Sequence, residues 1–372
     1  MGLDIGSRAT KAVLLSQVGE RVDIHDAQAI ELPPGIVSDG IVANRRAFAK
    51  LIGEQLVARH DVSTEVTFSI PSRLAMLRWV YLPRLPQAEL REAARFKVKR
   101  HLPFPVDQAY VVASQMEGEE DAGLPTLVIS VRREVVDSRA DAIAAAGLDP
   151  RRAELEAQAI LRVVERRLSK RSILWRDASL TIIDVGGENT HMYVVQNQRL
   201  QFIRGVKFGG EVFVNTVSQA LGIELDAARK LLGDPSSELA PTGELLLLER
   251  NVDLSRDLEK LTREFLRLLR YFRSLHPERS YAGILDHLVV CGGLVGLHGF
   301  AEYLQQTLGL RVERARPITG MMGLFDRDTF LSVASRQEAF SVATGLALAG
   351  LGADEVGGST NAEREFAWAR AC

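Results

Sequence analysis

The sequence has little of what secreted or membrane-spanning proteins need. Among 372 residues only Cys291 and Cys372 are cysteines, which excludes a disulfide framework or a multi-cysteine metal site and suits a reducing cytoplasm. No apolar run approaches the roughly 18 residues that cross a bilayer, and the first residues lack the basic and apolar regions of a secretory signal. We therefore expect a cytoplasmic protein that reaches a membrane only through partners.

An excess of charge of one sign is also missing. Lys and Arg number 46 and Asp and Glu 48, a net charge of −2, which argues against a general role in gripping nucleic acid. Hydrophobic residues make up 46% and charged residues 25% of the chain, as in ordinary globular proteins. The length and composition predict two or more folded domains.

The order of predicted elements is that of an α/β protein interrupted by a smaller segment. Residues 3–5 and 12–15 form two short strands joined by a tight turn, and a helix around 45–59 and a strand at 65–70 follow. From residue 72 to about 151 the pattern of predicted strands and helices changes to that of a small α+β insert. Its predicted elements are strands at 77–82, 110–115 and 126–131 and helices at 87–101 and 136–146.

The opening hairpin is repeated. Asp184-Val185-Gly186 lies 180 positions after Asp4-Ile5-Gly6, Thr190 matches Thr10 at the same offset, and apolar strand residues follow both. A helix at 253–274 with an amphipathic stripe, a strand at 285–290 and a helix at 299–308 come later in the second block. An internal duplication is the strongest single indication of the fold.

Each copy of the hairpin has a sequence pattern that is typical of a loop binding polyphosphate. Backbone amides at a glycine turn can point at phosphate oxygens, and an Asp at the end of the strand can orient hydrated Mg²⁺. A plain turn is the alternative for either loop alone. Two further glycine turns, Gly209-Gly210 and Gly292-Gly293, are either helix entries or ligand contacts.

The order of these parts resembles the actin-like ATPase superfamily, and within it the PilM family of type IV pilus assembly proteins, relatives of the division protein FtsA. The resemblance covers nearly the whole chain. It is carried by residues 2–7 with Lys11, by residues 96–107 with their Pro-Phe-Pro-Val-Asp ending, by residues 184–186 and by residues 208–210.

The resemblance implies an actin-like, duplicated ribonuclease H-type fold of two lobes with an FtsA-style α+β insert subdomain. The implied divisions are a first lobe (1–71 and 152–179), the insert (72–151), a second-lobe core (180–224 and 285–351), a helical part of the second lobe (225–284) and a polar C-terminal tail (352–372).

It also implies ATP and Mg²⁺ as ligands, held between the two blocks. The matching metal positions are Asp4 and Asp184. The matching nucleotide-binding positions are Gly6, Ser7, Lys11, Gly186, Gly187, Asn189, Thr190, Gly209, Gly210, Gly292 and Gly293. No residue is identified that would activate water, so no catalytic residue is assigned and the chain is at most a slow ATPase.

The function implied by the resemblance is that of a scaffold. PilM-like proteins lie on the cytoplasmic side of the inner membrane and hold the N-terminal cytoplasmic peptide of PilN between the first lobe and the insert. They thereby link the pilus platform to the motors of twitching motility. Contacts with other platform and motor proteins, and a homo-oligomer, are further expectations.

Four positions depart from the family pattern on the adenine side. Arg229 and Leu232 stand where the family has an acidic residue and a lysine, and Leu294 and Val295 stand where it has small residues. ATP bound in a repacked adenine pocket, weak ATP binding, and a cleft that no longer binds ATP are the three interpretations, in that order. An FtsA-like filament protein and a small-molecule kinase of the same superfamily are the alternative functions.

Overall fold

The computed structural model describes residues 1–57, 65–116, 123–170, 179–196, 199–248, 250–275 and 287–351. Backbone contacts divide the chain into two units. Unit 1 contains residues 1–14, 29–159 and those from 346 on, and unit 2 contains residues 15–28 and 160–345. The predicted tail at 352–372 lies outside the described residues.

The core of unit 1 is built on the opening hairpin. Strands β1 (Gly2–Ile5) and β2 (Ala9–Val18) pair antiparallel, with Asp4 opposite Lys11 and Ile5 opposite Thr10. Strand β6 (Glu65–Ile70) pairs parallel with β1, and β10 (Asp149–Leu155) pairs parallel with β6. With β3 (Arg21–Glu31) and β19 (Met322–Gly323), the sheet order is β10-β6-β1-β2-β3-β19.

Helices α1 (Arg45–Leu56) and α3 (Arg133–Ala145) pack against each other in unit 1. The Asn44 side chain accepts a hydrogen bond from the Ala47 amide and so begins α1, because its carboxamide satisfies one of the first free amides. A short hairpin of β4 (Val37–Ser38) and β5 (Ile41–Val42) precedes α1, and β5 lies against α3.

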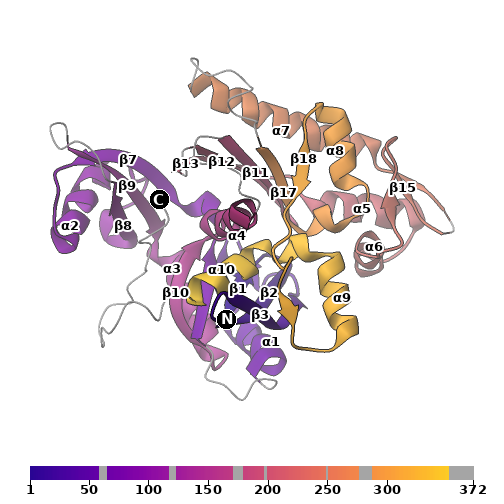
Figure 1. The fold of residues 1–372 in the computed structure, drawn as a ribbon, viewed down its shortest axis with the longest axis horizontal. Helices are drawn as coiled ribbons and strands as arrows, with labels where there is room; N and C mark the ends of the chain where they lie inside the picture. The colour runs from indigo at the N-terminus through magenta and orange to yellow at the C-terminus, as the bar shows by residue number, and fades with distance from the viewer. Residues whose placement is uncertain are drawn as a thin grey trace. The chain divides into compact units, whose positions relative to one another are not determined.

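The insert has a sheet of its own. Strands β7 (Met76–Leu82) and β8 (Ala109–Gln115) both pair antiparallel with the central β9 (Leu124–Arg132). Helix α2 (Gln87–Val98) lies on one face of this sheet (Figure 1) and buries Leu90, Ala94 and Val98, which share one helix face because they are four residues apart. The three strands and α2 confirm a small α+β unit within the predicted insert, whereas the helix predicted at 136–146 is α3, which packs against α1.

The second large sheet repeats the strand order of the first. Strands β11 (Ser179–Val185), β12 (Thr190–Gln196) and β13 (Arg199–Val206) form an antiparallel meander, β17 (His287–Cys291) pairs parallel with β11, and β18 (Val312–Arg314) pairs parallel with β17. The order β18-β17-β11-β12-β13 corresponds to β10-β6-β1-β2-β3. The predicted duplication is therefore confirmed.

Four helices contribute to the core around the unit 2 sheet: α5 (Gly210–Leu221), α6 (Leu225–Leu232), α7 (Ser255–Leu275) and α8 (Phe300–Leu308). Unit 2 also contains α9 (Arg327–Ser335) and a small sheet of β14 (Glu238–Leu239), β15 (Glu244–Leu246) and β16 (Val252–Asp253). The predicted stripe on α7 is buried, from Leu258 to Phe272.

Two helices span the boundary between the units in the sequence, α4 (Glu156–Lys170) and α10 (Ser341–Leu351). Within the described ranges, none of the helices combines the length and the apolar character that crossing a bilayer requires.

Candidate nucleotide-binding loops

The first loop presents a buried carboxylate next to a lysine. Asp4 is only 7% exposed, and the Lys11 ammonium lies 3.7 Å from its Oδ2 because the two residues are directly opposite in the β1–β2 ladder. The Gly6 amide donates to the Ala9 carbonyl at 3.1 Å and closes the turn. In the described part of the chain the Ser7 amide donates to no backbone carbonyl, so it is available to an anion.

A polar network supports this loop from below. The Ile5 amide donates to Ser69 Oγ at 3.0 Å. Arg139 on α3 is 1% exposed and donates to the carbonyl oxygens of Ser69 and Gly40, each at 2.8 Å. Burial lowers the pKa of Arg139 to about 10, which leaves it charged at neutral pH. The network ties the end of β1 to β6, to α3 and to the turn at Gly40.

Glu156 is a second acidic group beside the first loop, which the sequence did not identify. Its Oε2 accepts from the Ser72 amide at 3.1 Å, while Ser72 Oγ accepts from the Ala157 amide at 2.9 Å. Burial, followed by the negative charge of Asp4, raises the pKa of Glu156 to about 7. Two neighbouring acids that repel each other form a region in which a cation is favoured.

The second loop has the same turn and a different surrounding. The Gly186 amide donates to the Asn189 carbonyl at 3.0 Å, which matches Gly6 and Ala9, and Asp184 lies opposite His191. The Gly187 amide, like that of Ser7, donates to no backbone carbonyl within the ranges described. Thr190 Oγ1 donates to the Phe208 carbonyl at 2.7 Å and so fixes the loop to the entry of α5.

Gly209 and Gly210 hold this second loop in place. The amides of Gly210 and Glu211, at the start of α5, donate to the carbonyls of Gly186 and Gly187 at 2.9 and 2.8 Å. A side chain on Gly209 would overlap both carbonyls. These two amides are already used within the protein, so they do not reach a ligand in this conformation.

The third glycine turn packs directly on the second loop. Gly292 has φ +101°, and a Cβ there would lie 2.8 Å from Asp184 Oδ1 and would overlap the Val185 carbonyl. Its amide donates to the carbonyl of Glu338 at 3.1 Å. The predicted positions Asp184, Gly186, Gly209 and Gly292 are thus brought together within unit 2.

Three of the four departures on the adenine side are residues of the hydrophobic core. Leu294, Val295 and Leu232 are at most 8% exposed and belong to the unit 2 core, so their side chains turn inward and leave the backbone of the turn bare. Next to Gly293 no atom would meet an added Cβ within 4 Å.

Arg229 forms ion pairs with two acidic side chains of the protein. Its Nη2 lies 3.1 and 3.0 Å from the two carboxylate oxygens of Glu211, and its Nη1 contacts Asp226. Partial burial lowers the pKa of Arg229, but the hydrogen bonds and charges of Glu211 and Asp226 outweigh it and the pKa is raised. The side chain that replaces the family's acid is therefore neutralised locally.

The Pro-Phe-Pro-Val-Asp segment anchors the insert helix. The Phe104 ring lies 4.5 Å from the guanidinium carbon of Arg132, and Asp107 pairs with Arg95 of α2 at 3.1 Å. Two aromatic side chains of the insert face solvent, Tyr81 at 64% and Phe96 at 75% exposed. The Pro-Phe-Pro-Val-Asp segment therefore holds α2 in place, and the Phe96 side chain of α2 faces solvent.

The histidines that the structure describes do not form a metal site with other ligands. In the described ranges no group of three or more potential ligands is found, and His276 lies outside those ranges. His191 is buried and stacks on Tyr193.

Three comparisons bear on this geometry. Residues 2–351 match the family described as type IV pilus assembly protein PilM. A chain of a PilM-PilN type IV pilus biogenesis complex superposes with a TM-score of 0.74 at 24% identity, over 94% of this chain and 98% of that one. The ethanolamine utilization protein EutJ from Carboxydothermus hydrogenoformans gives 0.52 at 14% identity, over 93% and 88%.

A curated relative matches only a short stretch. Type II secretion system protein L of Xanthomonas campestris pv. campestris is 34% identical over 71 residues, so the match spans about a fifth, 19%, of each chain. The family match extends over nearly the entire chain, and the fold is the predicted actin-like one. The chain belongs to the PilM family of type IV pilus assembly proteins.

Proposed function

We propose that this chain is an ATP-binding scaffold of type IV pilus assembly that holds the N-terminal cytoplasmic peptide of a PilN-type partner. In this role it links the inner-membrane platform to the pilus motors and is peripheral to the membrane through that partner. The observation that carries the proposal is the family match over residues 2–351. The likeness over 94% of the chain to a protein solved in a PilM-PilN complex supports it.

The residues present fit the phosphate end of Mg-ATP. Asp4, with Glu156 beside it, would hold hydrated Mg²⁺, and Lys11 would neutralise phosphate charge. The amides of Ser7 and Gly187 have the free donors that a polyphosphate needs. The bare backbone at Gly292 and Gly293 would lie against the adenosine, and the family's acid and lysine have no counterpart at Arg229 and Leu232.

Titration with Mg-ATP, followed by calorimetry, tests the nucleotide. We expect binding to the wild-type protein and a loss of about tenfold or more in Asp4→Ala and in Asp184→Ala, because each removes a carboxylate that would orient the cation. Asp328→Ala, an exposed acid on α9, is the matched control and should bind as the wild type does. ATP binding that is indifferent to both loop variants would remove the cofactor from the proposal.

The insert offers the surface for the peptide. Phe96 and Tyr81 are large, apolar and exposed, and a peptide that covered them would gain the free energy of their burial. We expect Phe96→Ser to weaken binding of a PilN-type N-terminal peptide by about tenfold, since burial of a Phe side chain contributes about 1.5–3 kcal/mol.

Leu331→Ser is the control for the peptide experiment. Leu331 is 52% exposed on α9 in unit 2, so it matches the loss of an exposed apolar helix residue. Peptide binding without ATP binding would support the scaffold function and contradict the proposed nucleotide. ATP binding without peptide binding would contradict the scaffold and favour an independent ATPase.

A further inference from the structure

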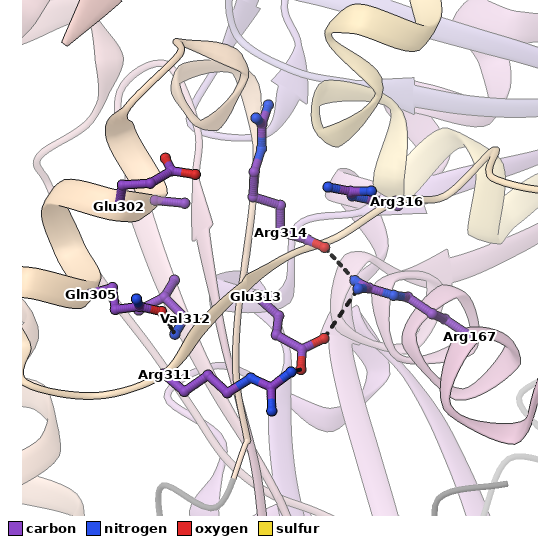
Figure 2. A pocket seen from close by; sticks show the side chains of 9 residues that line it. Arg167, Glu302, Gln305, Arg311, Val312, Glu313, Arg314 and Arg316 are labelled. Atoms are coloured by element: carbon purple, nitrogen blue, oxygen red, sulfur yellow. Dashed lines mark hydrogen bonds and ion pairs between the residues drawn. The ribbon is translucent and has the colours of Figure 1, made fainter. Parts of the chain in front are cut away.

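A pocket of about 260 Å³ lies beside β18 in unit 2, and none of the residues assigned above to the nucleotide or the peptide lines it. Its lining comes from three elements. Arg167 lies on α4, Glu302 and Gln305 lie on α8, and Arg311, Glu313 and Arg316 lie on β18 or next to it. Figure 2 shows Arg167 and Arg311 reaching Glu313 from opposite sides.

The backbone of β18 is closed to a further strand. It is the last strand of its sheet, so alternate backbone groups point outward. The Val312 amide donates to Gln305 Oε1 at 3.2 Å, and Arg167 donates to the Arg314 carbonyl (Figure 2). Because side chains already satisfy these groups, a ligand here is recognised by side chains and not by strand addition.

The pocket has more positive than negative charge. Four arginines and two glutamates line it, in a chain whose net charge is −2. Glu313 is shared by Arg167 at 3.1 Å and Arg311 at 3.4 Å. Arg314 is paired with the buried Glu338 at 2.9 Å, and its side chain turns away from the other arginines (Figure 2).

Two arginines at the rim keep donors to spare. Arg311 is 81% exposed and makes a single long ion pair. Arg316 is exposed and forms no ion pair with any residue that the structure describes. A guanidinium has five N–H donors in a planar fork that matches a carboxylate. The unused donors are therefore a recognition surface for acidic groups.

We propose that this pocket binds an acidic segment of a protein partner, with neighbouring carboxylates on Arg311 and Arg316. The volume admits one or two side chains, because it is below the range of roughly 300–1,000 Å³ of small-molecule sites. Arg311 and Arg316 are five residues apart on an extended segment, roughly 16 Å of backbone. That spread favours several carboxylates along a chain over one compact anion.

Fluorescence anisotropy with a labelled hexaglutamate peptide at low ionic strength tests the site on the full chain. We expect saturable binding that weakens with salt, and a loss of about tenfold or more in Arg311→Glu and in Arg316→Glu. Arg327→Glu is the matched control, since Arg327 is an exposed arginine on α9 of the same unit and its reversal changes the net charge equally. It should bind as the wild type does.

Three outcomes would overturn the proposal. Absence of hexaglutamate binding removes the site, and an equal loss in Arg327→Glu shows attraction by net charge alone. Displacement of the peptide by inorganic phosphate at matched charge concentration shows a small-anion site instead. Both rim arginines are exposed, so the variants are expected to fold, and thermal unfolding checks this.

The Glu313→Gln substitution shows whether Glu313 competes with the ligand or shapes the site, because the two roles change the peptide affinity in opposite directions. The carboxylate of Glu313 pairs with Arg311, one of the two arginines that a ligand would use. Its removal should tighten hexaglutamate binding about threefold or more, because Arg311 then has all its donors available to the peptide. Weaker binding in a folded Glu313→Gln protein would mean that Glu313 shapes the site, and would contradict the competition that the proposal requires.

Discussion

The two hairpins of the molecule have the same turn and rest on different supports. Gly6 and Gly186 donate to the residue three positions later, at 3.1 and 3.0 Å, and each Asp stands two residues earlier in the strand. Beneath the first hairpin are Ser69, Arg139 and Glu156, which are linked by hydrogen bonds and charge. Beneath the second lie the buried Cys291 and the backbone of Gly292.

The difference shows that a duplicated backbone does not need a duplicated environment. Unit 1 surrounds its loop with ionisable groups, whereas unit 2 positions its loop by close backbone approach and apolar packing. The register position that holds Lys11 in the first copy holds His191 in the second. The first loop is thus surrounded by more ionisable side chains than the second.

Removal of Arg139 should destabilise the polar network that supports the first hairpin. Arg139→Ala leaves the carbonyls of Ser69 and Gly40 buried without donors, and we expect a loss of about 3–5 kcal/mol in the free energy of unfolding. Urea denaturation measures the loss, and hydrogen exchange should show faster exchange of the Ile5 amide. A loss below about 1 kcal/mol would mean that the network does not support the hairpin.

The Glu156→Gln substitution should change how stability depends on pH. Burial, followed by the charge of Asp4, raises the pKa of Glu156 to about 7 in the folded protein, against an ordinary value of 4.5. The stabilisation from its bound proton is present below the ordinary value and is lost as pH rises through the folded one.

The measurement for Glu156 is the difference in unfolding free energy between Glu156→Gln and the wild type across that pH window. The variant should gain about 3 kcal/mol relative to the wild type from about pH 4.5 to pH 8, since a pKa unit corresponds to about 1.4 kcal/mol. A pH-independent difference would contradict the raised pKa. Glu165→Gln serves as a comparison in unit 2, where burial also raises the pKa to about 7 without an Asp4 nearby.

Gly292→Ala tests whether the close backbone approach of Gly292 positions the second loop. The residue has φ +101° and a Cβ would overlap the Val185 carbonyl, so we expect a loss of about 1–3 kcal/mol. Gly293→Ala is the neighbouring control, because an added Cβ there meets nothing within 4 Å, and its effect should stay within about 0.5 kcal/mol. Equal effects of the two substitutions would show that contact with the second loop does not constrain the turn.

The parts of the molecule that could be predicted from the sequence are those with local signals. The Asp-x-Gly turns and the α7 stripe depend on residues close together in the sequence, and the repeat of the turn 180 positions later is visible in the sequence itself. The structure confirms those elements. The supports depend on distant pairs. Ser72 and Glu156 are 84 positions apart and Gly40 and Arg139 are 99 apart, so no spacing rule joins them.

The adenine side illustrates a second limit of sequence reasoning. Leu294 and Val295 stand where the family has small residues, but a side chain's direction depends on how its turn packs against the core. Likewise, the identity of Arg229 does not reveal that Glu211, 18 positions earlier, neutralises it. Pattern matching identifies which residue departs from a family, and only packing shows whether the departure matters.

The smallest expected effect gives the sharpest test of equivalence between the hairpins. A Cβ on Gly6 would lie 2.8 Å from the Ala9 carbonyl oxygen, and one on Gly186 would lie 2.9 Å from that of Asn189. Because the crowding is the same, Gly6→Ala and Gly186→Ala should each lower the free energy of unfolding by about 1–2 kcal/mol. Denaturant titration of the two variants beside Gly293→Ala would separate turn crowding from the general effect of a glycine replacement, since Gly293 has open space around it and no positive φ. If the two losses differ by more than about 1 kcal/mol, the surroundings and not the shared turn decide how each loop is held.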